Sequence, residues 1–502
     1  MNKNMDLPME ETASSSSVQE KAFGVEMRQP NQKKMINKTW VESKMMWEIA
    51  APAMLTAVSQ FSIGFVTSAY VGHLGEVELA AVSIVQNVIE GFVYGVMLGM
   101  GSALETLCGQ AVGAGQLNML GIYMQRSWII TGITSLFLLP VYVFASPILK
   151  LLHQDKQISE LAGKYAKWIV PQLFAYSINF PIQKFLQAQS KVWVMTIISV
   201  VALAIHVVLN WMLVSKLDHG LLGAAIAGNI SWCLMVLAQI IYVVSGSFPE
   251  AWTGFSHSAF KSLAGFAKLS LASAVMLCLE VWYYTAVILM VGWLKNPEIA
   301  VDAISICMNL QLWTLMIALG FNAAISVRVS NELGAGNSKA AKFSVMVTVI
   351  TSTILGVIFT GVIVATKNEF PKVFTGKEVV IKEASKLAYF LAATIFLSSI
   401  LPVLHGVAVG AGWQMLVALI NIGCYYIIGL PIGAVLGYKF DLGVKGIWTG
   451  MLAGSGLQIF ILFFVIHRTN WSKEATQAEE RIRTWGGSPH PQQTSLEHNM
   501  NE

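Results

Sequence analysis

The sequence has 502 residues, of which 55% are hydrophobic and only 12% are charged, and its mean hydropathy is +0.61. Soluble globular domains carry about 25% charged residues, so this composition excludes a water-soluble domain and indicates a protein solvated by lipid. The net charge of +4 is spread over the whole chain, which excludes the concentrated basic face that a nucleic-acid partner would need.

We expect disordered tails at both ends of the chain. Residues 1–45 contain the run Ser14 to Ser17 with scattered Lys and Glu, and residues 468–502 are equally polar. Such segments hold too little apolar surface to offset the entropy lost on folding. No charged segment followed by a short apolar one opens the chain, so we also expect no cleavable signal peptide.

Long apolar runs recur between these tails. A helix needs roughly 20 apolar residues to cross the hydrocarbon layer, and by this criterion the sequence predicts about twelve spans. We therefore expect an all-α integral membrane protein. The centres of the runs lie near Ser59, Gly91, Thr134, Tyr176, Leu203, Met235, Glu280, Trp313, Leu355, Ile395, Tyr425 and Ile459.

The first two spans carry the first candidate functional residues. Pro52 lies near the start of the first span, where it either allows bending or simply occupies a first helical turn. In the second span, Gln86 and Asn87 are candidate solute contacts and Glu90 is a candidate proton-coupling residue. Glu90 is interpreted equally well as a hydrogen-bond partner in helix packing.

Glu280 stands in the middle of the seventh span, within the apolar stretch from Leu269 to Val291. A charged side chain at the centre of a bilayer is unfavourable by a few kcal/mol or more, and such residues mark ion or proton routes. Glu280 is therefore the main candidate for proton coupling, the alternative being that it faces another polar group and only fixes packing. Tyr283 and Tyr284 follow it as candidate solute contacts.

The eighth span adds three further candidate solute contacts, Asn309, Gln311 and Trp313. A mostly apolar wall with a few hydrogen-bonding groups is the usual design of a small-molecule site. Aromatic residues at helical spacing also pack against lipid or neighbouring helices, so this pattern does not by itself separate a binding wall from packing.

The tenth span holds Ser398, Pro402 and His405. Ser398 is a candidate solute contact and Pro402 a candidate hinge, since proline lacks a backbone donor yet is tolerated in membrane helices. His405 is a third candidate for proton coupling, and its alternative role is a histidine held by a neighbouring hydroxyl or carbonyl group.

The two halves of the chain are similar in sequence. Segments of the first half reappear in the second: Ala81-Val-Ser83-Ile84 as Ala303-Ile-Ser305-Ile306, Gly113-Ala-Gly115 as Gly334-Ala-Gly336, and Pro181 as Pro402. If each half has an even number of spans, the repeats are parallel and form two six-helix lobes around a central cavity. We place the N-lobe at 46–246, a linker at 247–263 and the C-lobe at 264–467. Basic residues beside the first and last spans favour cytosolic termini.

Other kinds of site are not indicated. The five cysteines show no metal-binding spacing, and the glycine-rich turns lack the nucleotide-binding pattern Gly-x-x-x-x-Gly-Lys-Ser/Thr. No nucleophile or paired-acid arrangement is visible either. We therefore expect neither a metal nor a cofactor nor an enzyme, and an ion gradient is the expected energy source.

Three segments together resemble a known family: Glu105-Thr-Leu-Cys-Gly-Gln-Ala111, Ser273 to Tyr283, and Arg328-Val-Ser-Asn-Glu-Leu-Gly-Ala-Gly336. They are similar to plant multidrug and toxic compound extrusion proteins of the DETOXIFICATION group, and most similar to the branch of the transparent testa flavonoid transporter and related vacuolar-membrane proteins. The resemblance covers roughly the whole span-bearing region and implies a carrier that exchanges protons for organic solutes. Many relatives place a second acid in the tenth span, where this sequence has Ser398.

The leading functional prediction is a secondary antiporter that moves organic solutes such as flavonoids, alkaloids or xenobiotics out of the cytosol. Its partners would be the solute, protons and the lipid bilayer, with the vacuolar membrane favoured over the plasma membrane. A monomer would suffice, because two lobes already enclose a pathway. The alternative is a channel or uniporter for chloride or organic anions, since an incomplete acid pair could uncouple transport from protons. A receptor or scaffold without flux is a third reading, against which the two-lobe plan argues.

Overall fold

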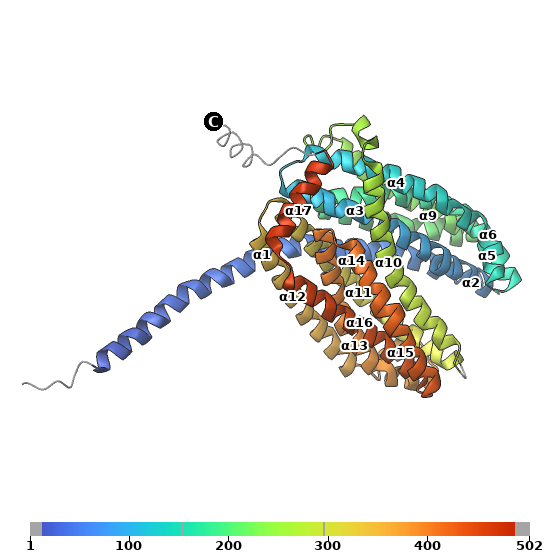
Figure 1. Ribbon diagram of the computed structural model, residues 1–502. Coiled ribbons are helices and arrows are strands. Elements are labelled where there is room, and N and C mark those ends of the chain that lie inside the picture. Colours follow the sequence, from blue (N-terminus) through green and yellow to red (C-terminus); the bar gives the residue numbers. More distant parts are fainter. Residues whose placement is uncertain (1–12, 153, 295–296, 487–502) are drawn as a thin grey trace, which may run out of the picture.

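The computed structural model describes residues 13–152, 154–294 and 297–486 of the chain, and no strand occurs among them (Figure 1). Eleven helices in this described part are long and apolar enough to cross a membrane. The remaining span is α7 (Val170–Ala188), whose hydropathy is lowered by polar residues that turn into the protein, among them Gln172, Asn179, Gln183 and Lys184. The predicted all-α, two-lobe fold is confirmed.

The N-lobe is built from the first half of the described chain. Besides α7, its elements are α1 (Ala13–Val71), α2 (Glu76–Ile84), η1 (Val85–Glu90), α3 (Gly91–Gly113), α4 (Asn118–Val143), α5 (Ala145–Leu151), α6 (Lys156–Trp168), α8 (Val192–Asn210), η2 (Trp211–Lys216) and α9 (Gly220–Val244). The second span consists of α2, η1 and α3 in direct succession, so that Glu90 ends a π-helical segment in the middle of a long helix.

The C-lobe follows a short connection that contains η3 (His257–Phe260). Its elements are α10 (Leu263–Gly292), α11 (Pro297–Gly334), α12 (Ser338–Ala365), η4 (Phe370–Val373), α13 (Glu378–Ala411), α14 (Gln414–Asn421), η5 (Ile422–Gly429), α15 (Leu430–Ala434), η6 (Val435–Lys439), α16 (Gly443–Arg468) and α17 (Trp471–Thr484).

The two halves that are similar in sequence also have matching backbone conformations at their turns. Asp218 and Asp441 occupy matching turns with φ of 52° and 53°, a left-handed conformation that Asp adopts more readily than most residues. Gly115 and Gly336 lie two residues after the ends of the matching helices α3 and α11, with φ of 70° and 73°. Glycine is suited to these positions because it has no Cβ to clash.

The two lobes meet at one end of the helix bundle, where α1 enters the bundle and α17 lies nearby. Away from this end the two sets of helices diverge (Figure 1). We call this end the termini face. Here Thr106 of α3 donates a 2.6 Å hydrogen bond to the carbonyl of Val409 in α13, and the Gln414 amide donates to Thr106 at 2.8 Å. One large buried apolar cluster contains residues of both lobes. Two smaller clusters lie one in the N-lobe and one in the C-lobe.

Both expected tails differ from the prediction within the described residues. In the N-terminal tail, residues 13–45 are helical and continue without a break into the first span. In the C-terminal tail, α17 forms after Asn470, whose side chain accepts a hydrogen bond from the Lys473 amide as an N-cap. Polar composition suggested disorder, but a spacing of three or four residues in α17 places apolar side chains on one buried face: Trp471, Ala475, Ala478 and Ile482. Residues 1–12 and 487–502 lie outside the described part.

The buried face of α17 docks it against the termini face. Arg481 donates to the carbonyl of Ala411 at 2.8 Å, and burial lowers the pKa of this guanidinium while Glu474 opposes the shift. Arg126 of the N-lobe reaches the carbonyl of Trp485, just after α17, at 3.1 Å. The segment after the last span therefore contacts both lobes.

Candidate functional site

Glu280 and His405 face each other inside the C-lobe. Glu280 comes from α10 and His405 from α13, and His405 Nδ1 lies 3.3 Å from Glu280 Oε2. Both side chains are largely shielded, with exposed fractions of 17% for Glu280 and 4% for His405. Glu280 and His405, which the sequence indicates separately as proton-coupling candidates, thus form one pair within the membrane-spanning helices.

A chain of hydrogen bonds extends from this pair. Gln458 of α16 places its amide nitrogen 2.8 Å from His405 Nε2 and 2.5 Å from the side-chain oxygen of Asn421 in α14. Asn421 then donates to the carbonyl of Met276 at 3.0 Å, one turn before Glu280 on α10. Because the Gln458 amide donates, His405 Nε2 accepts, which leaves the proton of a neutral imidazole on Nδ1, facing Glu280.

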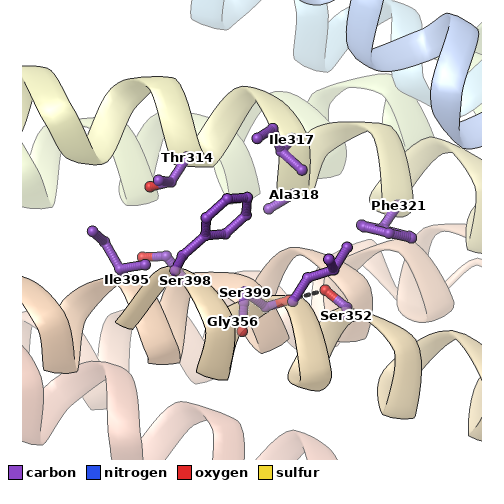
Figure 2. Close-up of a pocket in the computed structure, with 11 residues that line it drawn as sticks. Thr314, Ile317, Ala318, Phe321, Ser352, Gly356, Ile395, Ser398 and Ser399 are labelled. Carbon is purple, nitrogen blue, oxygen red and sulfur yellow. Dashed lines mark hydrogen bonds between the residues drawn. The ribbon is translucent and has the colours of Figure 1, made fainter. Parts of the chain in front are cut away.

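Ser398 forms a second polar point in the same lobe. Its hydroxyl group lies 3.5 Å from the Gln311 amide nitrogen, and Tyr284 lines a hollow together with Ser398. Small hollows lie on either side of Ser398. One is bounded by α10, α13 and α16 and is lined by Tyr284 and Ser455, and the other lies among α11, α12 and α13 (Figure 2).

The second hollow is mostly apolar. Figure 2 shows Ile317, Ala318 and Ile395 on its walls, with the hydroxyl groups of Thr314 and Ser398. Ser352 closes one side by donating to the carbonyl of Ser399. These groups offer neutral hydrogen-bonding atoms and no charge.

The N-lobe holds the third predicted titratable residue, Glu90. Tyr176 of α7 places its hydroxyl 3.4 Å from Glu90 Oε1 and equally far from Gln172 Oε1. Gln86, one turn earlier, instead faces α1, accepting from Ser68 at 2.8 Å and donating to the carbonyl of Gly64 at 3.2 Å. Glu90 and the Glu280–His405 pair therefore belong to different lobes.

The other predicted solute contacts divide into three kinds of environment. Asn87 and Asn309 are exposed and each donates to a carbonyl of its own helix. Trp313 packs edge-on against Phe61 of α1 with ring centroids 5.6 Å apart, across the lobe interface. Tyr283 is fully buried and stacks on Tyr425 at 4.2 Å, so it packs inside the C-lobe rather than lining a cavity.

Both candidate hinge prolines lie inside continuous helices, α1 and α13, and are buried. The carbonyl of Pro52 accepts hydrogen bonds from Thr56 at 2.9 Å and from Thr196 of α8 at 2.8 Å. The carbonyl of Pro402 accepts from the Asn322 amide of α11 at 2.7 Å. Each proline, which has no backbone N–H to donate within its own helix, thus accepts a hydrogen bond from a neighbouring helix through its carbonyl group.

Sequence reasoning missed Gln458, Asn421 and Tyr176. Each is a polar side chain in an apolar span, which was the available signal, but the sequence does not say which helix such a side chain faces. No group of three or more His, Cys, Asp or Glu side chains suited to a metal ion occurs in the described part of the chain.

Comparisons with known proteins agree with this architecture. The family model MatE matches residues 52–212 and 272–435. Protein DETOXIFICATION 33 of Arabidopsis thaliana is 58% identical over 91% of this chain and 95% of its own length, and Protein DETOXIFICATION 29 of the same plant is 54% identical over 89% of each. The crystal structure of the eukaryotic MATE transporter AtDTX14 matches with a TM-score of 0.84 at 32% identity, over 88% of this chain and 99% of that one.

Proposed function

The chain belongs to the MATE family of multidrug and toxic compound extrusion transporters, and we propose that it is a proton-coupled antiporter that moves organic solutes out of the cytosol. The expectation that it is not an enzyme is confirmed, because its relatives are named as transporters. The observation that carries the proton-coupling proposal is the pairing of Glu280 with His405 inside a membrane-spanning lobe.

The pair can act as a switch because its members hold helices together. Glu280 lies on α10, while His405, Gln458 and Asn421 connect α13, α16 and α14 back to that helix. A proton on Glu280 removes the charge that faces His405 and weakens the link between α10 and α13. A proton drives transport only if it binds the two access states with different affinity, and a pair whose separation changes with helix packing meets this condition.

The position of α10 would carry such a change to the other lobe. Trp282, two residues after Glu280, stacks on Phe92 of α3 with centroids 6.0 Å apart. Nearer the termini face, Gly99 of α3 has no room for a Cβ because Ala274 of α10 lies against it. Movement of α10 would therefore shift the contact between the lobes.

We propose that the solute lies between the lobes, near the aromatic contacts that bridge them. Trp313 with Phe61 and Trp282 with Phe92 offer flat apolar surfaces, and Gln86 lies beside α1 in the same region of the N-lobe. Aromatic walls with a few hydrogen-bonding groups suit planar organic molecules such as flavonoids, alkaloids or xenobiotics. The likeness to the transparent testa branch favours the vacuolar membrane, with the plasma membrane as the alternative. A monomer would suffice as the working unit, because the two lobes of one chain already enclose a pathway.

A second candidate function is passive conduction of chloride or organic anions. The observation that favours it is the set of neutral side chains around Ser398, namely Gln311 and Tyr284, which offers hydroxyl and amide donors where many relatives would place an acid. Hydroxyl and amide groups can donate hydrogen bonds to an anion. Glu280 would then act only in packing.

The test is flux into proteoliposomes that hold the purified wild-type protein or Glu280→Gln. Uptake of a flavonoid glycoside is measured with an imposed pH gradient, and chloride flux is measured separately. Gradient-driven uptake that Glu280→Gln abolishes supports the antiporter. The matched control is Glu383→Gln, which removes the half-exposed carboxylate of a surface ion pair in the same lobe and should leave uptake unchanged.

Chloride flux that ignores both the gradient and Glu280→Gln would establish the anion pathway instead. Gradient-driven uptake that survives Glu280→Gln would keep the antiporter and remove Glu280 from the coupling site.

A further inference from the structure

Two sequence motifs have no role in the solute or proton proposals, Glu105 to Gly115 in and after α3, and Arg328 to Gly336 in and after α11. They pack against each other at the termini face. Gly109 and Gly113, four residues apart, face Ser330 and Asn331 so closely that a Cβ would collide with them. Small residues at this spacing let two membrane helices approach backbone to backbone.

A buried ion pair lies beside this glycine contact. Arg328 of α11 donates from Nε to Glu42 Oε1 at 2.9 Å and from Nη2 to Glu42 Oε2 at 3.0 Å. Ser344 of α12 donates to the same carboxylate at 2.5 Å, and Glu332 accepts from Arg328 at 2.7 Å. The exposed fractions of the Arg328 and Glu42 side chains are 12% and 9%, so the pair is shielded from water.

The pair joins one lobe to the other. Glu42 lies on α1, which is tied to α8 of the N-lobe through hydrogen bonds of Thr196 to Pro52 and of His206 to Thr67. Arg328, Ser344 and Glu332 all lie on C-lobe helices. A second contact between α1 and the C-lobe lies one turn before Glu42, where the Lys38 ammonium lies 4.7 Å from the centre of the Phe343 ring of α12 in a cation–π contact.

We propose that the Glu42–Arg328 pair is a latch that holds the termini face closed and must separate for that face to open. The inference rests on the proposed transport function, in which the lobes move against each other. In the closed arrangement each charge has its partner, and in an open arrangement both charges are hydrated. Removing Arg328 leaves the Glu42 carboxylate buried with only the Ser344 hydroxyl when the face is closed, so it disfavours the closed state selectively. Removing the Glu42 charge breaks the link between the lobes but leaves Arg328 paired with Glu332 on its own helix, so it has a smaller effect.

The experiment measures distances between spin labels in the full-length protein in lipid nanodiscs, by double electron–electron resonance. Labels at Asn118→Cys and Lys339→Cys, both exposed, report on the termini face, and labels at His73→Cys and Trp293→Cys report on the opposite end. Cys233, the exposed native cysteine, is replaced by serine, and the other four cysteines are buried.

We expect Arg328→Gln to raise the ratio of open to closed molecules at the termini face by roughly tenfold or more, and Glu42→Gln to raise it by a smaller factor because Arg328 keeps Glu332. The double variant should shift the ratio no further than the larger single effect, because both changes break one interaction. The matched control Glu383→Gln, which breaks the exposed pair with Lys386, should leave the distances unchanged.

Wild-type distances in both folded single variants would overturn the latch, and so would strictly additive effects in the double variant. If either single variant fails to fold, Ser344→Ala removes only the hydroxyl donor to Glu42 and should give a smaller shift in the same direction; no shift there overturns the proposal. The distances need no ion gradient, so absence of gradient-driven flux in the wild type would refute the antiporter and leave the latch test standing.

Discussion

The ion pair between Lys184 and Glu105 gives a sharp stability prediction. Lys184 Nζ in α7 lies 2.6 Å from Glu105 Oε2 in α3, and the exposed fractions of the two side chains are 11% and 3%. The other carboxylate oxygen of Glu105 is buried without a hydrogen-bond partner among the described residues. Lys184 is therefore the main group that compensates a carboxylate inside the N-lobe.

Lys184→Met keeps the length of the side chain and removes its charge. Breaking a buried pair from one side typically destabilises a protein by about 3–5 kcal/mol, because a buried charge is left uncompensated. We expect Lys184→Met to lower the free energy of unfolding by about 3 kcal/mol or more, because Glu105 is almost fully buried. Replacing both partners, as in Glu105→Leu/Lys184→Met, should recover most of the loss because no charge remains inside the lobe.

The free energy of unfolding is measured by denaturant titration in mixed micelles, followed by tryptophan fluorescence. Lys386→Met is the control, because the Lys386–Glu383 pair is exposed and should contribute at most about 1 kcal/mol. The reasoning is refuted if Lys184→Met loses no more stability than Lys386→Met. It is also refuted if the double variant is less stable than Lys184→Met alone.

Two further predictions concern α13 and α16. Pro402→Ala restores a backbone donor in α13 and should slow solute flux if the proline is a hinge; an unchanged maximal flux rate in proteoliposomes would rule the hinge out. Trp448→Ala empties a fully buried site in the C-lobe and removes a 2.8 Å hydrogen bond to Thr394, so the unfolding titration should show a loss of about 3–5 kcal/mol. Trp448→Phe retains most of the volume and should lose clearly less, and equal losses in the two variants would contradict the packing argument.

The sequence was sufficient to predict the spans and the two lobes because both depend on local composition and on a repeat that can be seen by inspection. It also located Glu280, Glu90 and His405, since each is a titratable group in an apolar run. It could not show that Glu280 contacts His405 while Glu90 contacts Tyr176, because these contacts join helices far apart in the chain. The helical tails were missed for a different reason: a polar segment becomes ordered when one narrow apolar face finds a surface to cover, as α17 does.

The repeat also explains why the proposed coupling site lies in one lobe. The spacing that relates Pro181 to Pro402 relates Lys184 to His405, so both lobes carry a basic side chain at the same position. In the N-lobe that side chain is a lysine held by Glu105, and in the C-lobe it is a histidine facing Glu280. Lysine ordinarily stays charged at physiological pH, whereas histidine gains or loses its proton there. A lysine–carboxylate pair therefore suits a fixed link within the N-lobe, whereas a histidine–carboxylate pair suits the proton coupling that we propose for the C-lobe.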